Sequence, residues 1–276
     1  MNELWFALIL FVSSLGAGLL GALSGLGGGV VIVPLLTVIF HVDIHYAIGA
    51  SLVSVIATSS GAAAAYVREG FSNIRVGMFL EIATTLGALV GAWLTTRVPT
   101  KSIGIVFGLV LLYSAWASLR KMQEQMTGNP DAMAVRLRLA GELPVGDGVL
   151  PYVAQRVPLG FGLMWLAGAL SGLLGIGSGA VKVLAMDQAM RLPFKVSTTT
   201  SNFMIGVTAA ASAGIYWRSG YLAPALVFPV MLGVLAGSLI GSKLLVRAQV
   251  RTLKVVFSLV IVALGIEMIV NNLAGK

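Results

Sequence analysis

Long apolar runs alternate with short polar breaks along most of the chain. The runs cover 4–24, 28–40, 45–66, 74–95 and 102–120, then 157–174, 178–191, 196–217, 222–244 and 252–270. Most of them are about 20 residues long, and at about 1.5 Å per helical residue they can cross a hydrocarbon layer about 30 Å thick. The pattern therefore predicts an all-α polytopic membrane protein with eight to ten transmembrane segments.

The amino-acid composition agrees with this class. Hydrophobic residues make up 58% of the 276 residues and charged residues only 10%, whereas soluble domains carry about a quarter charged residues. The net charge of +8 comes from basic residues scattered between the apolar runs, and a nucleic-acid surface needs them gathered in a patch or stripe. Because there is no Cys and there are only two His, we expect no nucleic-acid partner, no metal and no cofactor.

The two halves of the chain repeat each other at a constant offset of 150 residues. The aligned pairs are Gly25/Gly175, Gly27/Gly177, Gly29/Gly179, Ser51/Ser201, Tyr66/Tyr216, Gly87/Gly237 and Phe107/Phe257. This repeat divides the chain into a first transmembrane repeat, 1–120, a polar connecting loop, 121–156, and a second transmembrane repeat, 157–276. The loop has room for one short surface helix near 132–140.

Each repeat contains an odd number of crossings. There are five if the short second segment spans the membrane, and three if the first two segments form a re-entrant hairpin. An odd number forces the second copy into the membrane upside down, so we expect inverted-topology repeats, an architecture typical of secondary transporters.

Basic residues predict the orientation, because Lys and Arg in loops are retained on the cytoplasmic side. One side of the predicted topology collects eleven of them, including those of the connecting loop, and the other side has Arg97, Lys101, Arg218 and Lys276. We therefore expect a cytoplasmic (inner) membrane protein with the connecting loop in the cytoplasm and both termini outside.

A glycine-rich cluster precedes the short second segment of each repeat. The candidate binding residues in these clusters are Gly27, Gly28 and Gly29 in the first and Gly177, Ser178 and Gly179 in the second. Such clusters break a helix, and the helix that follows points free N–H groups and its positive dipole end into the membrane interior. We expect an anion site there. The alternative is close helix packing, as expected for the GxxxG pairs Gly87/Gly91 and Gly237/Gly241.

The segment Gly25–Leu35 followed by Ala47–Leu52 resembles the TauE/SafE family of membrane proteins. This family contains sulfite and organosulfonate exporters and is also known as a toluene-sulfonate uptake permease group. The resemblance extends over both halves and implies transport of a small sulfur-containing oxyanion, mostly outward. The chain departs from the family pattern at Ala50, where Thr is frequent, at Ser178, which replaces a Gly, and at Leu184, which stands where the first half has Pro34.

Two charged residues fall inside apolar segments. Lys182 lies three residues after the second cluster, where a charge costs about 2.5–3.5 kcal/mol on membrane-insertion scales. It could bind the anion, form a structural ion pair or reach toward water. Glu81 lies about 12 Å along the segment 74–95. It could carry a coupling proton, or it could be a structural carboxylate bonded to Lys182 or to helix backbone.

Hydroxyl and amide side chains follow both short segments, and such groups can donate hydrogen bonds to sulfonate oxygens. Ser51, Ser201 and Asn202 are candidates for substrate binding, although Ser and Thr also bond back to their own helix. Asp43, between His41 and His45, is better explained as a helix cap than as a metal ligand.

The sequence thus favours a secondary transporter that exports sulfite or an organosulfonate such as sulfoacetate by alternating access. A passive anion channel and an importer of thiosulfate or another small anion remain alternatives. We do not expect an enzyme, because there is no nucleophile–base pair. Besides the substrate and the lipid bilayer, a second copy of the chain is a possible partner, since the GxxxG faces would also suit a homodimer.

Overall fold

The computed structural model describes residues 3–24, 28–68, 72–119, 131–145, 148–245 and 250–274. The first half contains six helical elements, which are α1 (Glu3–Ser24), α2 (Gly29–Pro34), the π-helix η1 (Leu35–Ile39), α3 (Ile44–Arg68), α4 (Ile74–Thr95) and α5 (Thr100–Leu119). The second half contains α7 (Val157–Leu174), α8 (Gly179–Leu184), the π-helix η2 (Ala185–Ala189), α9 (Phe194–Arg218), α10 (Pro224–Leu245) and α11 (Val250–Ala274). The predicted helical architecture is confirmed over these residues.

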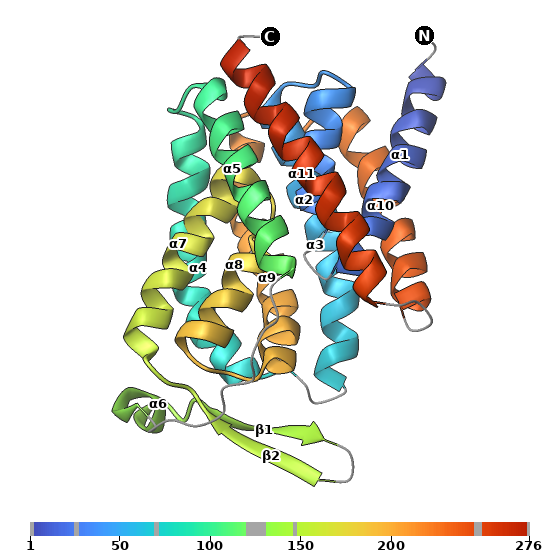
Figure 1. The fold of residues 1–276 in the computed structure, drawn as a ribbon. Helices are drawn as coiled ribbons and strands as arrows, with labels where there is room; N and C mark the ends of the chain where they lie inside the picture. The colour runs from blue at the N-terminus through green and yellow to red at the C-terminus, as the bar shows by residue number, and fades with distance from the viewer. Residues whose placement is uncertain are drawn as a thin grey trace.

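The elements of the two halves correspond one to one. From α2 and α8 through α5 and α11, corresponding elements begin 150 residues apart, as Gly29 and Gly179 do. The corresponding helices run in opposite directions in Figure 1, where α1 descends from the N-terminus at the top and α7 rises from the bottom, beside the strands. Likewise α5 descends from the top, whereas α11 rises to the C-terminus at the top (Figure 1).

The helices of one half pack against those of the other. Helix α1 packs on α10 and α4 packs on α7, while α3 meets its own counterpart α9 and α5 meets its counterpart α11. A contact between α1 and α10 is thus matched by a contact between their counterparts, α7 and α4. The two halves interlock in this way and bury a large apolar core between them, with a second, smaller apolar cluster beside it.

Glycines allow the helices of the two matched contacts, α4–α7 and α1–α10, to approach each other closely. A Cβ added to Gly87 would overlap the carbonyl oxygen of Trp165, and one added to Gly237 would overlap that of Leu15, the residue 150 positions earlier. Because only glycine allows backbones to approach this closely, the packing interpretation is confirmed for Gly87, Gly91 and Gly237. The side-chain surroundings of Gly241 lie outside the described residues.

The short second segments end in an unexpected but identical way. Each begins as a six-residue α-helix and continues as a π-helix, in which Phe40 N–H donates to the Leu35 carbonyl and Met190 N–H to the Ala185 carbonyl. A residue in the left-handed region follows each π-helix, His41 with φ 54° and Arg191 with φ 53°. These turns end the segments after about three helical turns.

The polar connecting loop contains structure that the sequence analysis missed. The expected short helix is present as α6 (Ala132–Arg136), and a two-stranded antiparallel hairpin follows it, β1 (Ala140–Val145) and β2 (Gly148–Val153), with Leu143 paired to Leu150. The hairpin lies below the helix bundle in Figure 1. Asn73, the N-cap of α4, fastens it by donating from Nδ2 to the Ala140 carbonyl at 3.2 Å and to the Tyr152 hydroxyl at 3.0 Å.

Large apolar side chains cover much of the outer surface of the bundle. Among them are Leu8 and Val12 on α1, Ile82 and Leu86 on α4, Leu109 on α5, Phe228 and Leu232 on α10 and Leu259 on α11. Within the described residues, α4 and α7 are long and apolar enough to cross a membrane, and apolar stretches of 10–17 residues lie in the other long helices, α9 excepted. An apolar surface of this extent is what a lipid environment requires.

Candidate functional site

Lys182 lies in the interior of the bundle. It is on α8, within the first turn after the second glycine-rich cluster, and its side chain is 0% exposed. Its Nζ donates to Thr208 Oγ1 on α9 at 2.6 Å. An ammonium group has three N–H donors, and among the described residues this hydroxyl is its one acceptor.

Glu81 lies on α4, facing the same hydroxyl. Its side chain is 7% exposed, and its Oε1 accepts from Thr208 Oγ1 at 2.7 Å and from Thr85 Oγ1 at 3.1 Å. Its other oxygen, Oε2, is buried and has no hydrogen-bond partner among the described residues. A buried acceptor without a donor is costly, typically by about 1–3 kcal/mol and more when charged.

Thr208 connects the two charged groups. Its hydroxyl accepts from Lys182 and has a single proton to give, which either Glu81 Oε1 or the Met204 carbonyl at 2.9 Å can accept. Lys182 and Glu81 are therefore bridged through a hydroxyl and are not in direct ionic contact. This cluster, which we name the Lys182–Thr208–Glu81 triad, joins α8, α9 and α4.

Only one half of the molecule carries the charges of the triad. The counterpart of Lys182 is Ile32, and the counterpart of Glu81 is Met231. Thr208 does have a polar counterpart, Thr58, whose hydroxyl bonds back to the carbonyls of its own helix. Both charged residues were expected from the sequence, whereas Thr208 was not. The repeat offset that pairs it with Thr58 was the available signal.

The second glycine-rich cluster is a sharp break between α7 and α8. Gly175 and Gly177 have φ of 67° and 70°, and Ser178 also lies in the left-handed region, with φ 40°. Ser178 Oγ donates to the Ala167 carbonyl, and its own carbonyl accepts from Lys182 N–H at 3.0 Å. Its hydroxyl is thus already engaged with α7.

The described part of the first cluster is tightly packed. Gly27 lies outside the described residues. A Cβ on Gly28 would lie 2.8 Å from Val234 Cγ1, and one on Gly29 would lie 2.8 Å from Ser51 Oγ and 3.0 Å from the Gly175 carbonyl oxygen. Gly29 therefore brings the start of α2 against the break of the other half.

The three polar candidates behind the clusters have different surroundings. Ser51 is fully buried and donates to the Gly175 carbonyl at 2.7 Å, so it joins α3 to the other half. Ser201 is also buried and donates to the Gly179 carbonyl, at a longer 3.4 Å. Asn202 is half-buried on α9. Both serine hydroxyls thus hold the start or the break of a short segment in place.

Asp43 is confirmed as a helix cap. Its Oδ1 accepts from the N–H of His45 in the first turn of α3 at 2.9 Å, and it also lies 2.9 Å from His45 Nδ1. The His45 ring stacks on Tyr221 with 4.7 Å between ring centroids. In the described part of the chain, no three His, Asp or Glu side chains are grouped so that they could hold a metal ion.

Between the start of α4 and the hairpin, an open hollow of about 640 Å³ has mixed polar and apolar walls. Asn73, Arg75, Glu142 and Tyr152 line it with five further residues. Burial raises the pKa of the Tyr152 phenol, and its hydrogen bond with Asn73 lowers that pKa by less. The phenol therefore stays protonated and keeps the hairpin fastened to α4.

Comparison with known proteins agrees with this picture. The family model described as "Sulfite exporter TauE/SafE" matches residues 10–268. The chain is similar to the probable membrane transporter proteins YunE of Bacillus subtilis (27% identical, covering 96% of this chain and 98% of the relative) and YdhB of the same organism (28%, 86% and 87%). It is also similar to a probable membrane transporter protein of Xylella fastidiosa (25%, 93% and 92%). No solved structure matches the chain. Because the family model covers nearly the whole sequence, the protein is a membrane protein that belongs to the TauE/SafE transporter family.

Proposed function

We propose that this protein is a secondary transporter that carries a small sulfur-containing oxyanion, such as sulfite or an organosulfonate, across the cytoplasmic membrane. The observation that carries the proposal is the fully buried Lys182 ammonium, which has one acceptor among the described residues for its three donors. A buried cation needs compensation by an anion or by acceptors, and the oxygens of a sulfite or sulfonate group would supply both. The description of the family supports the choice of sulfur oxyanions.

The proposed site lies where α8 begins. Lys182 is the main ligand, and the amides of Gly177, Ser178 and Gly179 line the same turn, with Ser201 and Asn202 on the neighbouring α9. In the first half, Gly28, Gly29 and Ser51 form the opposing wall of the proposed site, and Gly27 is assigned to it from the sequence alone. The contact of Gly29 and Ser51 with Gly175 supports this placement, because it brings the two broken segments together.

Alternating access fits the arrangement of the helices. We infer that the halves are inverted-topology repeats, and the support comes from the opposite directions of corresponding helices and the matched contacts α1–α10 and α7–α4 (Figure 1). Such repeats can exchange conformations and so expose one site to each side in turn. Full burial of Lys182 favours this carrier mechanism over a passive channel, because a channel keeps its site open to water.

Thermal stabilisation of the purified protein by added anions tests the proposal. The panel contains sulfite, thiosulfate, sulfoacetate and taurine, with acetate as the carboxylate comparison. We expect at least one sulfur oxyanion to raise the unfolding temperature of the wild type, because a ligand of the native state stabilises it by mass action. Lys182→Met, which keeps the length of the side chain without its charge, should abolish that rise.

Two further variants distinguish a loss of anion binding from a folding defect. Lys101→Met removes an exposed lysine at one end of the bundle and should keep the full stabilisation. The double variant Lys182→Met with Glu81→Gln removes both buried charges and should fold as a monodisperse protein without responding to the anions. Equal stabilisation of the wild type and the double variant would reject Lys182 as the anion ligand.

A further inference from the structure

The carboxylate of Glu81 is already bridged to Lys182 through Thr208, and an incoming oxyanion would compete with this carboxylate for Lys182. We propose that Glu81 is the counter-ion of Lys182 in the absence of substrate, and that the transported anion replaces it at Lys182 only when Glu81 takes up a proton. This inference rests on the proposed function and deepens it, because it assigns the charge class of the transported anion and its coupling to protons. The transported anion is a singly charged oxyanion that moves together with one proton.

The geometry of the triad is that of a replaceable ligand. Glu81 reaches Lys182 only through the Thr208 hydroxyl, with links of 2.6 and 2.7 Å. A direct ion pair would hold the ammonium more strongly than a bridge through a neutral group. The bridged arrangement leaves N–H donors of Lys182 without acceptors among the described residues, and these donors match the oxygens of an incoming anion.

Charge balance then requires the proton. Before the anion binds, the buried site holds one positive group and one negative group. Entry of a singly charged anion would leave one uncompensated negative charge in an interior of low dielectric constant, which is strongly unfavourable. Protonation of Glu81 restores neutrality. It also makes the carboxyl group neutral. The Oε2 atom of Glu81 has no hydrogen-bond donor, and leaving a buried oxygen without a donor costs less free energy when the group is neutral than when it is charged.

Within the described residues, no salt bridge or side-chain hydrogen bond joins another charged group to the triad. The helices packed against the triad carry their remaining charged residues at or beyond their ends, within the described residues. These are Asp43 before α3, His45 and Arg68 on α3, Arg75 on α4 and Arg97 after it, Lys101 on α5, Arg156 before α7, Asp187 on η2, Arg191 after η2, and Lys195 and Arg218 on α9. Helix α7 carries no charged residue. Tyr216 on α9 is neutral and hydrogen-bonded to Thr95 and to the Gly172 carbonyl.

The pH dependence of anion binding measures how many protons the protein takes up when the anion binds. The probe is methanesulfonate, whose single negative charge is constant over the range used, so that every proton taken up belongs to the protein. If binding requires one proton, the dissociation constant of the wild type should rise about tenfold for each pH unit, or about a hundredfold between about pH 5.5 and 7.5. Isothermal titration calorimetry in two buffers of different ionisation enthalpy should count about one proton per bound anion.

Glu81→Gln should remove this dependence. The neutral amide mimics the protonated carboxyl, so the variant should bind methanesulfonate with the same affinity at both pH values, and at least as tightly as the wild type does at the lower one. The matched control is Glu267→Gln on α11, which changes an exposed carboxylate and should leave the wild-type slope intact.

The outcomes separate this inference from the proposed function. A flat pH profile in the wild type, or an unchanged slope in Glu81→Gln, would overturn the proton-coupled exchange. Failure of methanesulfonate to bind while thiosulfate binds would overturn the assignment to singly charged anions, yet leave sulfur oxyanion transport standing. Absence of binding for every sulfur oxyanion would remove both. The wild-type titration alone decides the question if Glu81→Gln does not fold.

Discussion

The Ser51 hydroxyl shows how a residue that looks like a ligand can serve the scaffold. Ser51 is fully buried on α3, and its hydroxyl donates a hydrogen bond to the carbonyl of Gly175 in the other half of the molecule. That carbonyl lies at a left-handed break, where no regular helix continues to provide it with a donor. The hydroxyl therefore ties α3 to the point at which α7 ends.

Ser51→Ala should destabilise the protein. Removing the donor leaves the buried Gly175 carbonyl without this partner, which typically costs about 1–3 kcal/mol. The control is Ser60→Ala on the same helix, because Ser60 is exposed and donates to the carbonyl of its own Ile56. Chemical or thermal unfolding in detergent should show a clear loss for the first variant and little change for the second. Equal stability of the two variants would argue against a structural role for Ser51.

At the scale of elements, the interfaces α4–α7 and α1–α10 are built on glycine. A Cβ on Gly168 would overlap the carbonyl oxygen of Thr84, and one on Gly18 would overlap that of Val234, which is 150 positions after Thr84. Backbone contacts of this kind cannot relax by rotating a side chain. The spacing of the helices in both interfaces is therefore fixed by the absence of a side chain.

Gly168→Ala should separate α4 from α7 and destabilise the bundle. Overpacking of a well-packed interface costs typically about 1–3 kcal/mol, and here the obstacle is backbone. The same helix offers a control, Gly162→Ala, because nothing lies within 4 Å of a Cβ at Gly162. We expect a lower unfolding temperature or a loss of monodisperse protein for Gly168→Ala, with Gly162→Ala close to wild type. A fully stable Gly168→Ala protein would show that the helices can move apart freely.

The long helices were predictable because their apolar runs are as long as the helices themselves. The run 74–95, for example, has the bounds of α4. The hairpin β1–β2 was harder to see, because Pro144 and Pro151 interrupt its alternation and both of its strands are short. Its available signal was the Gly146-Asp147 pair between two short apolar runs, which favours a tight hairpin turn. The π-helices have no comparable signature.

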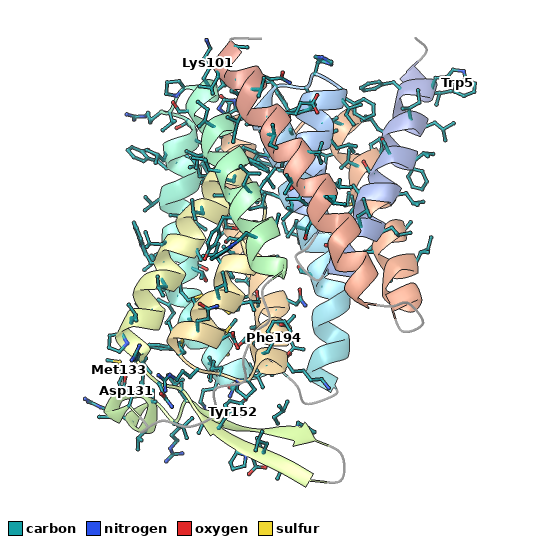
Figure 2. The ribbon with its side chains drawn as sticks, in the orientation of Figure 1. Trp5, Lys101, Asp131, Met133, Tyr152 and Phe194 are labelled. Carbon is teal, nitrogen blue, oxygen red and sulfur yellow. The ribbon has the colours of Figure 1, made fainter. Side chains whose placement is uncertain are left out.

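At the scale of the whole molecule, the two ends of the bundle differ. Figure 2 shows Trp5 and Lys101 at one end and Asp131, Met133 and Tyr152 at the other. The helix α6 and the hairpin lie at the second end (Figure 1), and Arg136 and Arg138 lie at the end of α6 and just after it. In a membrane, these two ends would face opposite compartments.

Single cysteines can test this orientation, because the chain contains none. Lys101→Cys and Glu142→Cys place exposed thiols at opposite ends of the bundle. In intact spheroplasts, a membrane-impermeant maleimide should label the first at once and the second only after permeabilisation, because the basic loop is retained in the cytoplasm. The unmodified protein provides the unlabelled control. Labelling of both positions from the same side would contradict the proposed topology.

The sequence by itself determined the helical membrane class, the repeat of 150 residues and the places where helices break, since apolar run length and glycine density are local properties of the chain. Only the tertiary structure decided what the buried polar groups do. It placed Thr208 between Lys182 and Glu81, and it gave the hydroxyl of Ser51 to Gly175. Those partners are 26, 127 and 124 positions apart. No local pattern can specify such pairs, because they form only when separate helices pack together.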